Sequence, residues 1–312
     1  MKIFNGVNIP KSFKRSAIAI GNFDGIHKGH QKVFKETKKI AKKKKIKFGV
    51  LTFTPLPVMF FNKKIKNYRL ASEEQKLKIF KKNGVDFTIN IKFNKKFSRM
   101  KAEDFIKKII YRKLDSKFLA VSNNFKFGRN RKGDVNLLKK FRNKYNYHLL
   151  NIKPFKHLGK IVSSTRIRKY LKNGHINLAN KLLARTWSIE GQVTKGKKIG
   201  RKLGYRTCNI SVNNYILPKT GIYAARVLIG NEKKLHGAVA YLGSRPTFGG
   251  KKIFLEANIF GIKKNLYKKK LTVFLLKFIR KDEKFKNSEQ LIRQMNKDII
   301  FAKKGLKIKL VL

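Results

Sequence analysis

The feature that most constrains the fold of this chain is a change of rhythm near residue 185. Before that point, apolar segments of strand length alternate with segments whose apolar residues recur every three or four positions. The expected strands lie at residues 16–20, 46–53, 85–91, 117–122 and 147–153. The expected helices lie around residues 33–41, 72–84, 101–114 and 134–145. This alternation predicts an α/β domain with a doubly wound parallel sheet.

After residue 185, short apolar segments follow one another without intervening helices. They lie at residues 188–194, 221–229, 235–242, 253–260 and 271–278, and a helical pattern returns only at residues 288–304. Successive strands without crossover helices predict a small antiparallel β-barrel domain, here with a C-terminal helix. We therefore expect two domains, residues 1–185 and 186–312, with two further helices, at 164–172 and 176–183, closing the first.

The charge of the chain is the next constraint. Its 312 residues include 78 Lys and Arg against 16 Asp and Glu, a formal net charge of +62. Such an excess is typical of nucleic-acid-binding proteins, but here the basic residues are scattered over every segment and only 16 of the 78 are Arg. We interpret the charge as a general compositional bias and expect no specific nucleic-acid partner.

The single cysteine, Cys208, excludes an intrachain disulfide and a zinc site built on several thiolates. Residues 1–6 contain no apolar signal core, and no segment approaches the roughly 18 apolar residues of a membrane span. We therefore expect a cytoplasmic protein without a membrane partner.

The segment from Gly21 to His30 carries the first chemical motif. It follows an apolar strand and opens a helix, whose first backbone N–H groups are unpaired and lie at the positive end of the helix dipole, where phosphate oxygens bind well. His27 and His30 are three residues apart, so both rings can donate to one phosphate group. Capping of the helix, or a metal, is the structural alternative. The predicted phosphate site includes Gly21, Asn22, Phe23, Asp24 and Gly29.

A second phosphate cradle is expected where residues 163–168 open another helix. Hydroxyls and unpaired backbone amides converge there, and Arg166 or Arg168 can clamp the β- and γ-phosphates. Alone, this pattern also fits an ordinary helix cap with solvent-facing arginines. Together with the histidine segment, it predicts a two-part ATP site outside the carboxyl ends of the sheet. The hydroxyl-bearing residues are Ser163, Ser164 and Thr165.

Residues 14–184 resemble the FMN adenylyltransferase module of bacterial bifunctional riboflavin kinase/FAD synthetases. The segments that carry the resemblance are residues 21–31, 52–57, 123–129 and 163–168. The resemblance implies that a flavin lies beside residues 123–127, where aromatic rings offer apolar surface and amides can hydrogen-bond it. The implied flavin contacts are Asn123, Asn124, Phe125 and Phe127. The chain departs from the family at Leu56, where a histidine is usual, and at Asn124, where an acid is usual.

The second half of the chain contains a glycine-rich segment followed by two oxygen-bearing side chains. Gly196, Gly200 and Gly204 predict a flap whose backbone can approach phosphates. Thr207 and Asn209 are two residues apart, so on a strand they share one face. Neutral oxygens together with nucleotide phosphates and water suit Mg²⁺. A turn in which both side chains make only local bonds is the structural alternative.

Residues 196–209, 217–223, 243–250 and 255–258 resemble the riboflavin kinase module of the same enzymes. The resemblance implies that Glu256 is the general base for the terminal ribityl hydroxyl and that Arg245 contacts the flavin. A solvent-facing glutamate is the alternative for Glu256. The departures in this half are Arg206, Cys208 and Asn258, where proline, alanine and histidine are usual.

We therefore expect a bifunctional enzyme that uses ATP and Mg²⁺. Its C-terminal domain would phosphorylate riboflavin to FMN, and its N-terminal domain would join FMN to AMP from a second ATP, giving FAD and pyrophosphate. One alternative is another His-x-Gly-His nucleotidyltransferase with an impaired kinase module. Another is a basic nucleic-acid-binding protein, whose affinity would fall steeply with salt.

Overall fold

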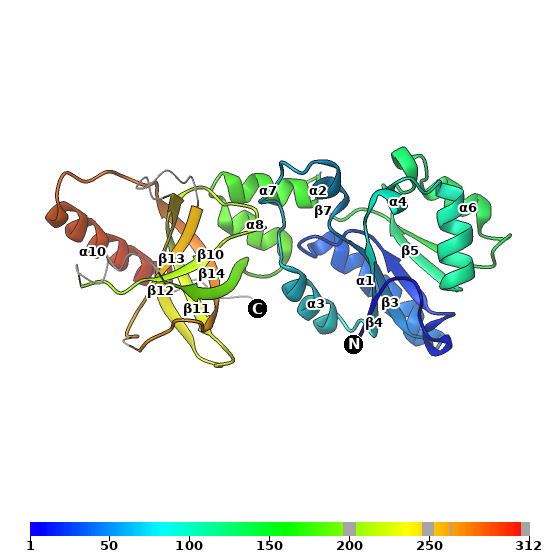
Figure 1. Cartoon of the computed structure of the whole chain (residues 1–312), viewed down its shortest axis with the longest axis horizontal. Coiled ribbons are helices and arrows are strands. Elements are labelled where there is room, and N and C mark those ends of the chain that lie inside the picture. The colour runs from blue at the N-terminus through cyan, green and yellow to red at the C-terminus, as the bar shows by residue number, and fades with distance from the viewer. Residues whose placement is uncertain (196–203, 245–252, 263, 307–312) are drawn as a thin grey trace. The chain divides into compact units, whose positions relative to one another are not determined.

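A computed structural model describes residues 1–195, 204–244, 253–262 and 264–306. The chain divides into two compact units, Met1–Lys66 with Glu73–Ser163, and Asn67–Ser72 with Ser164–Leu312 (Figure 1). The helices expected at the end of the first domain thus pack with the second unit, and a short segment of the first half does so as well.

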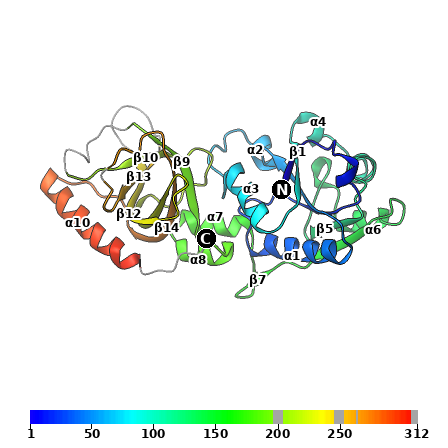
Figure 2. The same cartoon turned by 90° about the horizontal axis from the view of Figure 1, so that it is seen from below.

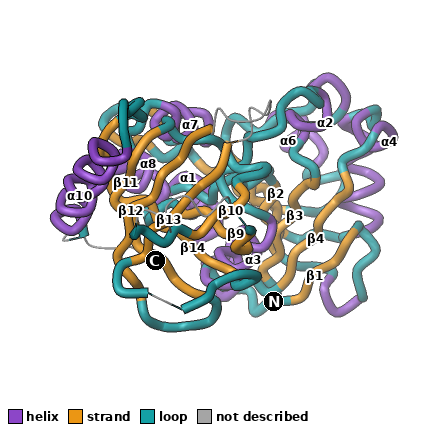
Figure 3. Tube along the Cα trace, turned by 60° about the vertical axis from the view of Figure 1, so that its left-hand side comes forward, coloured by secondary structure: helices purple, strands orange, loops and turns teal. Residues whose placement is uncertain are grey.

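The first unit is built on a six-stranded sheet in which every pair of neighbours is parallel, which confirms the predicted α/β class. The strand order is β1-β4-β3-β2-β5-β6, and Figure 3 shows the first four of these side by side. The strands are β1 (Lys2–Asn5), β2 (Ala17–Ile20), β3 (Phe48–Thr54), β4 (Phe87–Lys92), β5 (Phe118–Ser122) and β6 (His148–Ile152). Two short strands, β7 (Lys156–His157) and β8 (Lys160–Ile161), form a separate hairpin.

Helices cover both faces of this sheet, and the residues of β2 show why. Ala17 and Ala19 belong to the core beneath α1 and α3, where the small side chains let a helix approach, whereas Ile18 and Ile20 fill the core on the other face. Figure 1 shows α1 and α3 on one side of the sheet and α6 on the other. The helices of this unit are α1 (Lys28–Lys43), α2 (Pro57–Phe61), α3 (Glu73–Lys82), α4 (Lys95–Ser98), α5 (Ala102–Asp104), a π-helix (Phe105–Lys113) and α6 (Val135–Phe141).

The strand order creates a topological switch point at β2. The chain runs from β2 outward to β3 and β4, and then returns to add β5 and β6 on the other side of β2. In open parallel sheets, ligands bind outside the carboxyl ends of the strands at such a point. The segments that follow β2, β3 and β5 meet at this edge, and each contains one of the motifs singled out in the sequence.

The second unit is centred on a closed barrel, which confirms the predicted antiparallel domain. Its described strands follow the order β10-β13-β12-β11-β14-β9, all in antiparallel pairs. The elements are α7 (Ser164–Lys172), α8 (Ile176–Leu183), β9 (Ser188–Thr194), β10 (Cys208–Ser211), β11 (Gly221–Ile229), β12 (Leu235–Ser244), β13 (Ile253–Ile259), β14 (Lys270–Arg280) and α10 (Ser288–Gly305). Figure 2 shows α10 lying along the outside of the barrel. Among the helices of the described ranges, none is both long and apolar enough to cross a membrane.

Residues 67–72 form a short segment of the second unit that we call the strap. Arg69 forms a parallel bridge with Tyr215, and its backbone N–H donates to the carbonyl of Asn214 at 2.8 Å. The indole Nε1 of Trp187, a fully buried side chain, donates to the carbonyl of Leu70 at 2.8 Å. The strap is therefore held by backbone and side-chain hydrogen bonds from residues more than one hundred positions further along the chain.

A bidentate ion pair joins helix α10 to the barrel. The Arg280 guanidinium donates to both carboxylate oxygens of Asp298, at 2.8 and 2.7 Å, and the Asp298 side chain is only 3% exposed. Bidentate geometry and burial make this pair stronger than a surface ion pair.

Replacing Asp298 with Ala should lower the free energy of unfolding of the second unit by about 2 kcal/mol, because the Arg280 guanidinium, which is itself largely buried, loses its charged acceptor. The only tryptophan of the chain, Trp187, lies in this unit, so thermal unfolding followed by its fluorescence reports the change. Glu289→Ala is the matched control, since that carboxylate of α10 is 77% exposed and its contact with Arg293 is 4.0 Å long. Equal unfolding midpoints for the two variants would contradict the assigned role of the pair.

Candidate active sites

The two histidines of the first motif lie together at the start of α1. The His27 Nδ1 accepts a hydrogen bond from the backbone N–H of His30 at 3.4 Å, so His27 is the N-cap of the helix. The two rings are stacked, with centroids 3.7 Å apart and planes inclined by 18°. A Cβ at position 29 would lie 3.1 Å from the His27 ring, which explains the glycine between them. The histidines therefore cap the helix and also share one small region at the switch point.

The turn before these histidines is shaped by unusual backbone conformations. Phe23 and Ile26 have positive φ values of 46° and 35°, which residues with side chains seldom adopt. As a result, the Phe23 side chain points into the core, against Phe34 and beside the His30 ring. Any contribution of Phe23 to phosphate binding is thus limited to its backbone. Gly21 lies where a Cβ would be 3.1 Å from the Phe23 ring.

A polar chain beneath this turn was not anticipated from the sequence. Thr52, at the carboxyl end of β3, donates its hydroxyl to the carbonyl of Asn22 at 3.1 Å. The Nζ of Lys76 lies 3.5 Å from that hydroxyl and 2.9 Å from a carboxylate oxygen of Glu73. Lys76 is 4% exposed, so a buried positive charge lies next to the predicted phosphate turn. Its position four residues before Phe80, on the inward face of α3, is the sequence signal that would have identified it.

The segment after β5, which the resemblance assigns to the flavin, is divided between surface and core. Asn123 accepts a hydrogen bond from Asn151 at 2.7 Å, and Asn124 accepts one from the Ser122 hydroxyl at 2.8 Å; both asparagines are exposed. Phe125 is partly exposed and stacks on Phe127, with centroids 5.4 Å apart. The Phe127 ring is buried in the sheet core, so Phe125 offers the accessible aromatic surface of the pair.

Residues 163–168, the second predicted phosphate segment, are divided between the two units. Ser163 belongs to the first unit, and the carbonyl of the preceding Val162 lies 3.5 Å from where a Cβ of Gly29 would be. This places the end of the first unit beside the histidine turn. Ser164, Thr165 and Arg168 belong to the second unit, in the first turns of α7.

Arg168 is buried in the second unit and holds the strap. Its Nε donates to the carbonyl of Tyr68 at 2.9 Å, and its guanidinium lies over the Tyr68 ring at 3.7 Å from the centroid. The side chain is therefore engaged with residues 67–72, not directed into solvent as an exposed cap residue would be.

The oxygen-bearing residues of the second half come together across β10 and β13. Asn209 lies directly opposite Glu256 in this antiparallel pair. The Thr207 hydroxyl is 3.5 Å from a carboxylate oxygen of Glu256. Leu255 and Ala257 are fully buried inside the barrel, so Glu256 faces outward from β13. The pair Thr207 and Asn209 and the separately predicted Glu256 thus share one patch on the outer face of the barrel.

Tyr241 extends this patch and was not predicted. It lies opposite Glu256 on the other neighbouring strand, β12, and its hydroxyl donates to a carboxylate oxygen of Asp282 at 2.7 Å. No sequence pattern marks it, because its relation to Glu256 depends on the register of two strands. Gly204 is described, with a φ of +84°, whereas Gly196, Gly200 and Arg245 lie outside the described residues.

Cys208 lies between two residues of the patch but faces the other way. It pairs with Ala257, whose side chain is inside the barrel, and burial raises the pKa of the Cys208 thiol. Since the thiolate is the reactive form, a raised pKa lowers the reactivity of the thiol near neutral pH.

Alkylation of Cys208 by iodoacetamide at pH 8 should be slower in the folded protein than in guanidinium chloride, because burial raises the pKa of the thiol and so leaves less of the reactive thiolate. Mass spectrometry of the intact chain measures both rates. A chain with Cys208→Ala and Asn213→Cys is the control, since position 213 is exposed and should react at similar rates in both conditions. Equal rates for Cys208 itself would contradict its burial.

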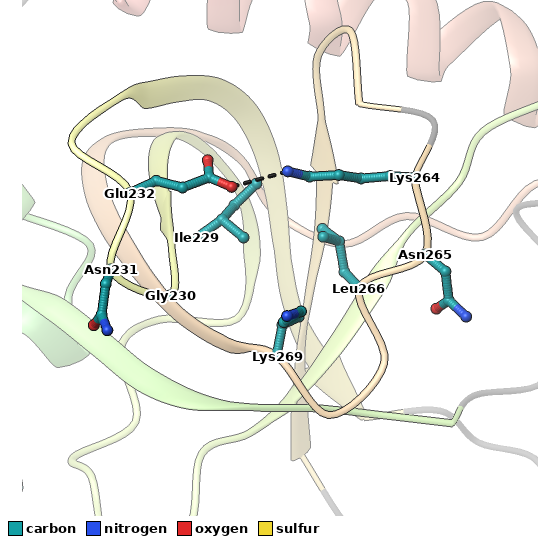
Figure 4. Close-up of a pocket in the computed structure, with 8 residues that line it drawn as sticks. All are labelled: Ile229, Gly230, Asn231, Glu232, Lys264, Asn265, Leu266 and Lys269. Atoms are coloured by element: carbon teal, nitrogen blue, oxygen red, sulfur yellow. Dashed lines mark hydrogen bonds and ion pairs between the residues drawn. The ribbon is translucent and has the colours of Figure 1, made fainter.

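A cavity of about 550 Å³ lies at the turns that follow β11 and precede β14, and it contains none of the predicted site residues (Figure 4). Glu232 and Lys264 point toward one another there and form an ion pair of 2.8 Å. Hydrogen bonds from Lys264 and from the partly buried His236 hold the pKa of Glu232 below its usual value. Across the described part of the chain, no group of three or more His, Cys, Asp or Glu side chains is arranged to hold a metal ion.

Comparison with known proteins assigns both halves of the chain. Residues 9–166 match the family model described as FAD synthetase, and residues 183–306 match that described as riboflavin kinase. The bifunctional riboflavin kinase/FMN adenylyltransferase of Buchnera aphidicola subsp. Schizaphis graminum is 41% identical over 308 residues, 97% of this chain and 98% of that protein. The protein of the same name from Escherichia coli K12 is 32% identical, with 97% of each chain covered.

A solved structure resembles the whole chain. The crystal structure titled "Macrolide-efflux Protein" from Streptococcus pneumoniae superimposes with a TM-score of 0.84 at 26% sequence identity, covering 96% of this chain and 98% of the other. The order of the two folds along the chain is therefore shared with a solved structure over nearly its full length.

Proposed function

Because the chain belongs to the family of bifunctional riboflavin kinases/FMN adenylyltransferases, we propose that its two activities are carried by the two groups of residues described above. The enzyme phosphorylates riboflavin to FMN and adenylylates FMN to FAD. We assign the kinase to residues 186–312 and the adenylyltransferase to residues 1–185. What supports the assignment is that His27 and His30 lie together at the switch point of the parallel sheet. In the barrel, Thr207, Asn209 and Glu256 lie together on one face.

In the kinase half, Glu256 acts as the general base. The terminal ribityl hydroxyl of riboflavin loses its proton to the Glu256 carboxylate while its oxygen forms a bond to the γ-phosphorus of ATP; the bond to the β,γ-bridging oxygen breaks, and ADP leaves. The proposal rests on the outward orientation of Glu256 beside Thr207 and opposite Asn209. A carboxylate within this patch can accept the proton without entering the apolar interior of the barrel.

Thr207 and Asn209 are the proposed Mg²⁺ ligands. Their neutral side-chain oxygens suit a hard cation, and their position beside a carboxylate fits a metal that is also bound by nucleotide phosphates and water. When bound, Mg²⁺ neutralises charge on the transferred phosphoryl group. The main-chain groups of Gly196, Gly200 and Gly204 are proposed to contact the same phosphates.

In the adenylyltransferase half, the FMN phosphate attacks the α-phosphorus of ATP, and pyrophosphate leaves. The attacking phosphate is already anionic, so the step needs no general base. His27 and His30 donate hydrogen bonds to charge that develops on the α-phosphate and the leaving group. Their stacked rings at the N-terminus of α1, at the switch point of the sheet, support this role.

The remaining binding residues are proposed from the motifs found in the sequence. ATP is proposed to contact Gly21, Asn22, Asp24, Gly29, Ser163 and the backbone of Phe23, all in the first unit. Ser164, Thr165 and Arg168, in the first turns of α7, stay phosphate contacts predicted from the sequence alone, and the Arg168 guanidinium itself contacts Tyr68. The flavin is proposed to lie against Phe125, with Asn123, Asn124 and Phe127 in the FMN site and Arg245 in the kinase site. The substrates ATP, riboflavin and FMN are small molecules, and a cytoplasmic location stays a prediction from the sequence.

A product time course tests the order of the two activities. The protein is incubated with riboflavin, ATP and Mg²⁺, and flavins are separated chromatographically. FMN should form first and FAD after it, and excess EDTA should stop the formation of FMN. Formation of FAD from added FMN but never from riboflavin would refute the proposed kinase site.

A further inference from the structure

Three successive residues that lead into β10 are each held by a different side-chain contact. The Tyr205 hydroxyl donates to Asn296 of α10 at 2.7 Å. The Asn258 side-chain amide donates to the carbonyl of Arg206 at 2.8 Å. The Thr207 hydroxyl lies 3.5 Å from the Glu256 carboxylate. Residues 205–207 are thus held by side chains of β13 and of α10.

Of these three contacts, the hydrogen bond from Asn258 is the one that bears directly on the proposed chemistry. Glu256 and Asn258 are two residues apart on β13, so both face outward from the barrel, while Ala257 between them is buried inside. The last backbone pair of the ladder joins Cys208 to Ala257. Beyond that pair, the side-chain amide of Asn258 holds β13 to the segment before β10, because it donates to the carbonyl of the peptide group immediately before Thr207.

The orientation of a peptide group sets the position of the next Cα atom, because the peptide bond is planar. The hydrogen bond from Asn258 therefore restrains the backbone that carries Thr207, and it does so from the strand that also carries Glu256. One strand thereby fixes the spacing between a proposed metal ligand and the proposed general base. Catalysis is sensitive to such spacing, since a displacement of about 1 Å costs about 10²-fold in rate.

We propose that Asn258 is a positioning residue of the riboflavin kinase, acting through the carbonyl of Arg206 to hold Thr207 beside Glu256. This inference rests on the roles proposed for Thr207 and Glu256. It assigns Asn258 no contact with substrate. Its effect is on the alignment of the phosphoryl-transfer site and on the Mg²⁺ concentration that this site requires.

The test compares three replacements of Asn258 in the full-length protein. Asn258→Ala removes the donor, and Asn258→Asp keeps the shape but turns an acceptor toward the Arg206 carbonyl. Both should lower kcat for riboflavin phosphorylation about tenfold and raise the Mg²⁺ concentration for half-maximal activity several-fold. Asn258→His places a ring N–H where the amide nitrogen was, and it should retain activity within about threefold of the original.

Two controls separate this role from a purely structural one. Adenylylation of added FMN and the unfolding midpoint followed by Trp187 should be unchanged in all three variants. Asn231→Ala, which removes an exposed asparagine from the turn after β11, should leave kinase activity and its Mg²⁺ dependence unchanged.

The proposal is overturned if Asn258→Asp phosphorylates riboflavin with the original kcat and Mg²⁺ requirement. It is also overturned if activity falls only in parallel with the unfolding midpoint, because that result assigns Asn258 to stability. Failure of the underlying site assignment looks different: Thr207→Ala and Glu256→Gln would then leave the kinase intact.

Discussion

Replacing Glu256 with Gln should lower kcat for riboflavin phosphorylation by about 10²- to 10⁴-fold, the usual contribution of a general base. Glutamine has nearly the same shape, and its side-chain oxygen can still accept a hydrogen bond from the Thr207 hydroxyl. It cannot, however, take a proton from the ribityl hydroxyl. The formation of FMN from riboflavin, separated chromatographically at saturating ATP and Mg²⁺, measures the change. The KM for riboflavin should change much less, because the carboxylate acts on the transferred proton and not on the flavin ring.

The bifunctional chain supplies internal controls for this result. Adenylylation of added FMN by the Glu256→Gln protein should be unchanged. Glu232→Gln, which removes a barrel carboxylate that is ion-paired with Lys264, should leave both activities unchanged. Retention of more than a tenth of the original kinase activity in Glu256→Gln would exclude it as the base.

Replacing His30 with Ala should lower the formation of FAD from FMN by about 10²- to 10³-fold, comparable to the loss of one preorganised donor to transition-state charge. The His27 ring remains as the N-cap, although it loses its stacking partner at 3.7 Å. Production of FAD and pyrophosphate from FMN and ATP measures the effect. Phosphorylation of riboflavin should continue, so FMN should accumulate in a reaction that begins with riboflavin.

His148→Ala is the matched control for His30→Ala. His148 is the first residue of β6, at the amino ends of the strands, and its ring stacks on Phe118 at 4.8 Å. It therefore lies at the edge of the sheet opposite to the switch point, and its replacement should leave FAD formation unchanged. Equal losses in the two variants would mean that His30 acts only through stability.

The periodicity of the sequence was sufficient to predict both folds, because strong hydrophobic patterns dominate local structure. It identified five of the six parallel strands, the main helices between them, and every described strand of the barrel except β10. It missed β1, a four-residue edge strand with mostly exposed side chains, whose pairing with β4 depends on a partner more than eighty residues away. It also missed the strap at residues 67–72, whose structure is set by α7 and by residues 214–216.

The directions in which the side chains of the predicted sites point could not be predicted from the sequence. Phe23 and Phe127 lie within predicted sites, but positive φ at Phe23 and the packing of Phe127 against Phe105 direct both rings into the core. The motif at residues 163–168 suggested Arg166 or Arg168 as a phosphate clamp, but it gave no sign that the Arg168 guanidinium contacts Tyr68 in the strap. The neighbourhood of Glu256 and Thr207 required the register of β10 and β13, which local pattern does not contain.

The strap also bears on how the polypeptide matures as it leaves the ribosome. The chain passes between its two units after residues 66, 72 and 163, so neither unit is one uninterrupted stretch. Residues 67–72 are synthesised long before Trp187 and Tyr215, the residues that later hold them. During that interval the buried side chains of Leu70 and Ala71 have no native contacts in the second unit. Folding of the second unit therefore requires residues 67–72, which must remain accessible in the nascent chain until the barrel has been translated.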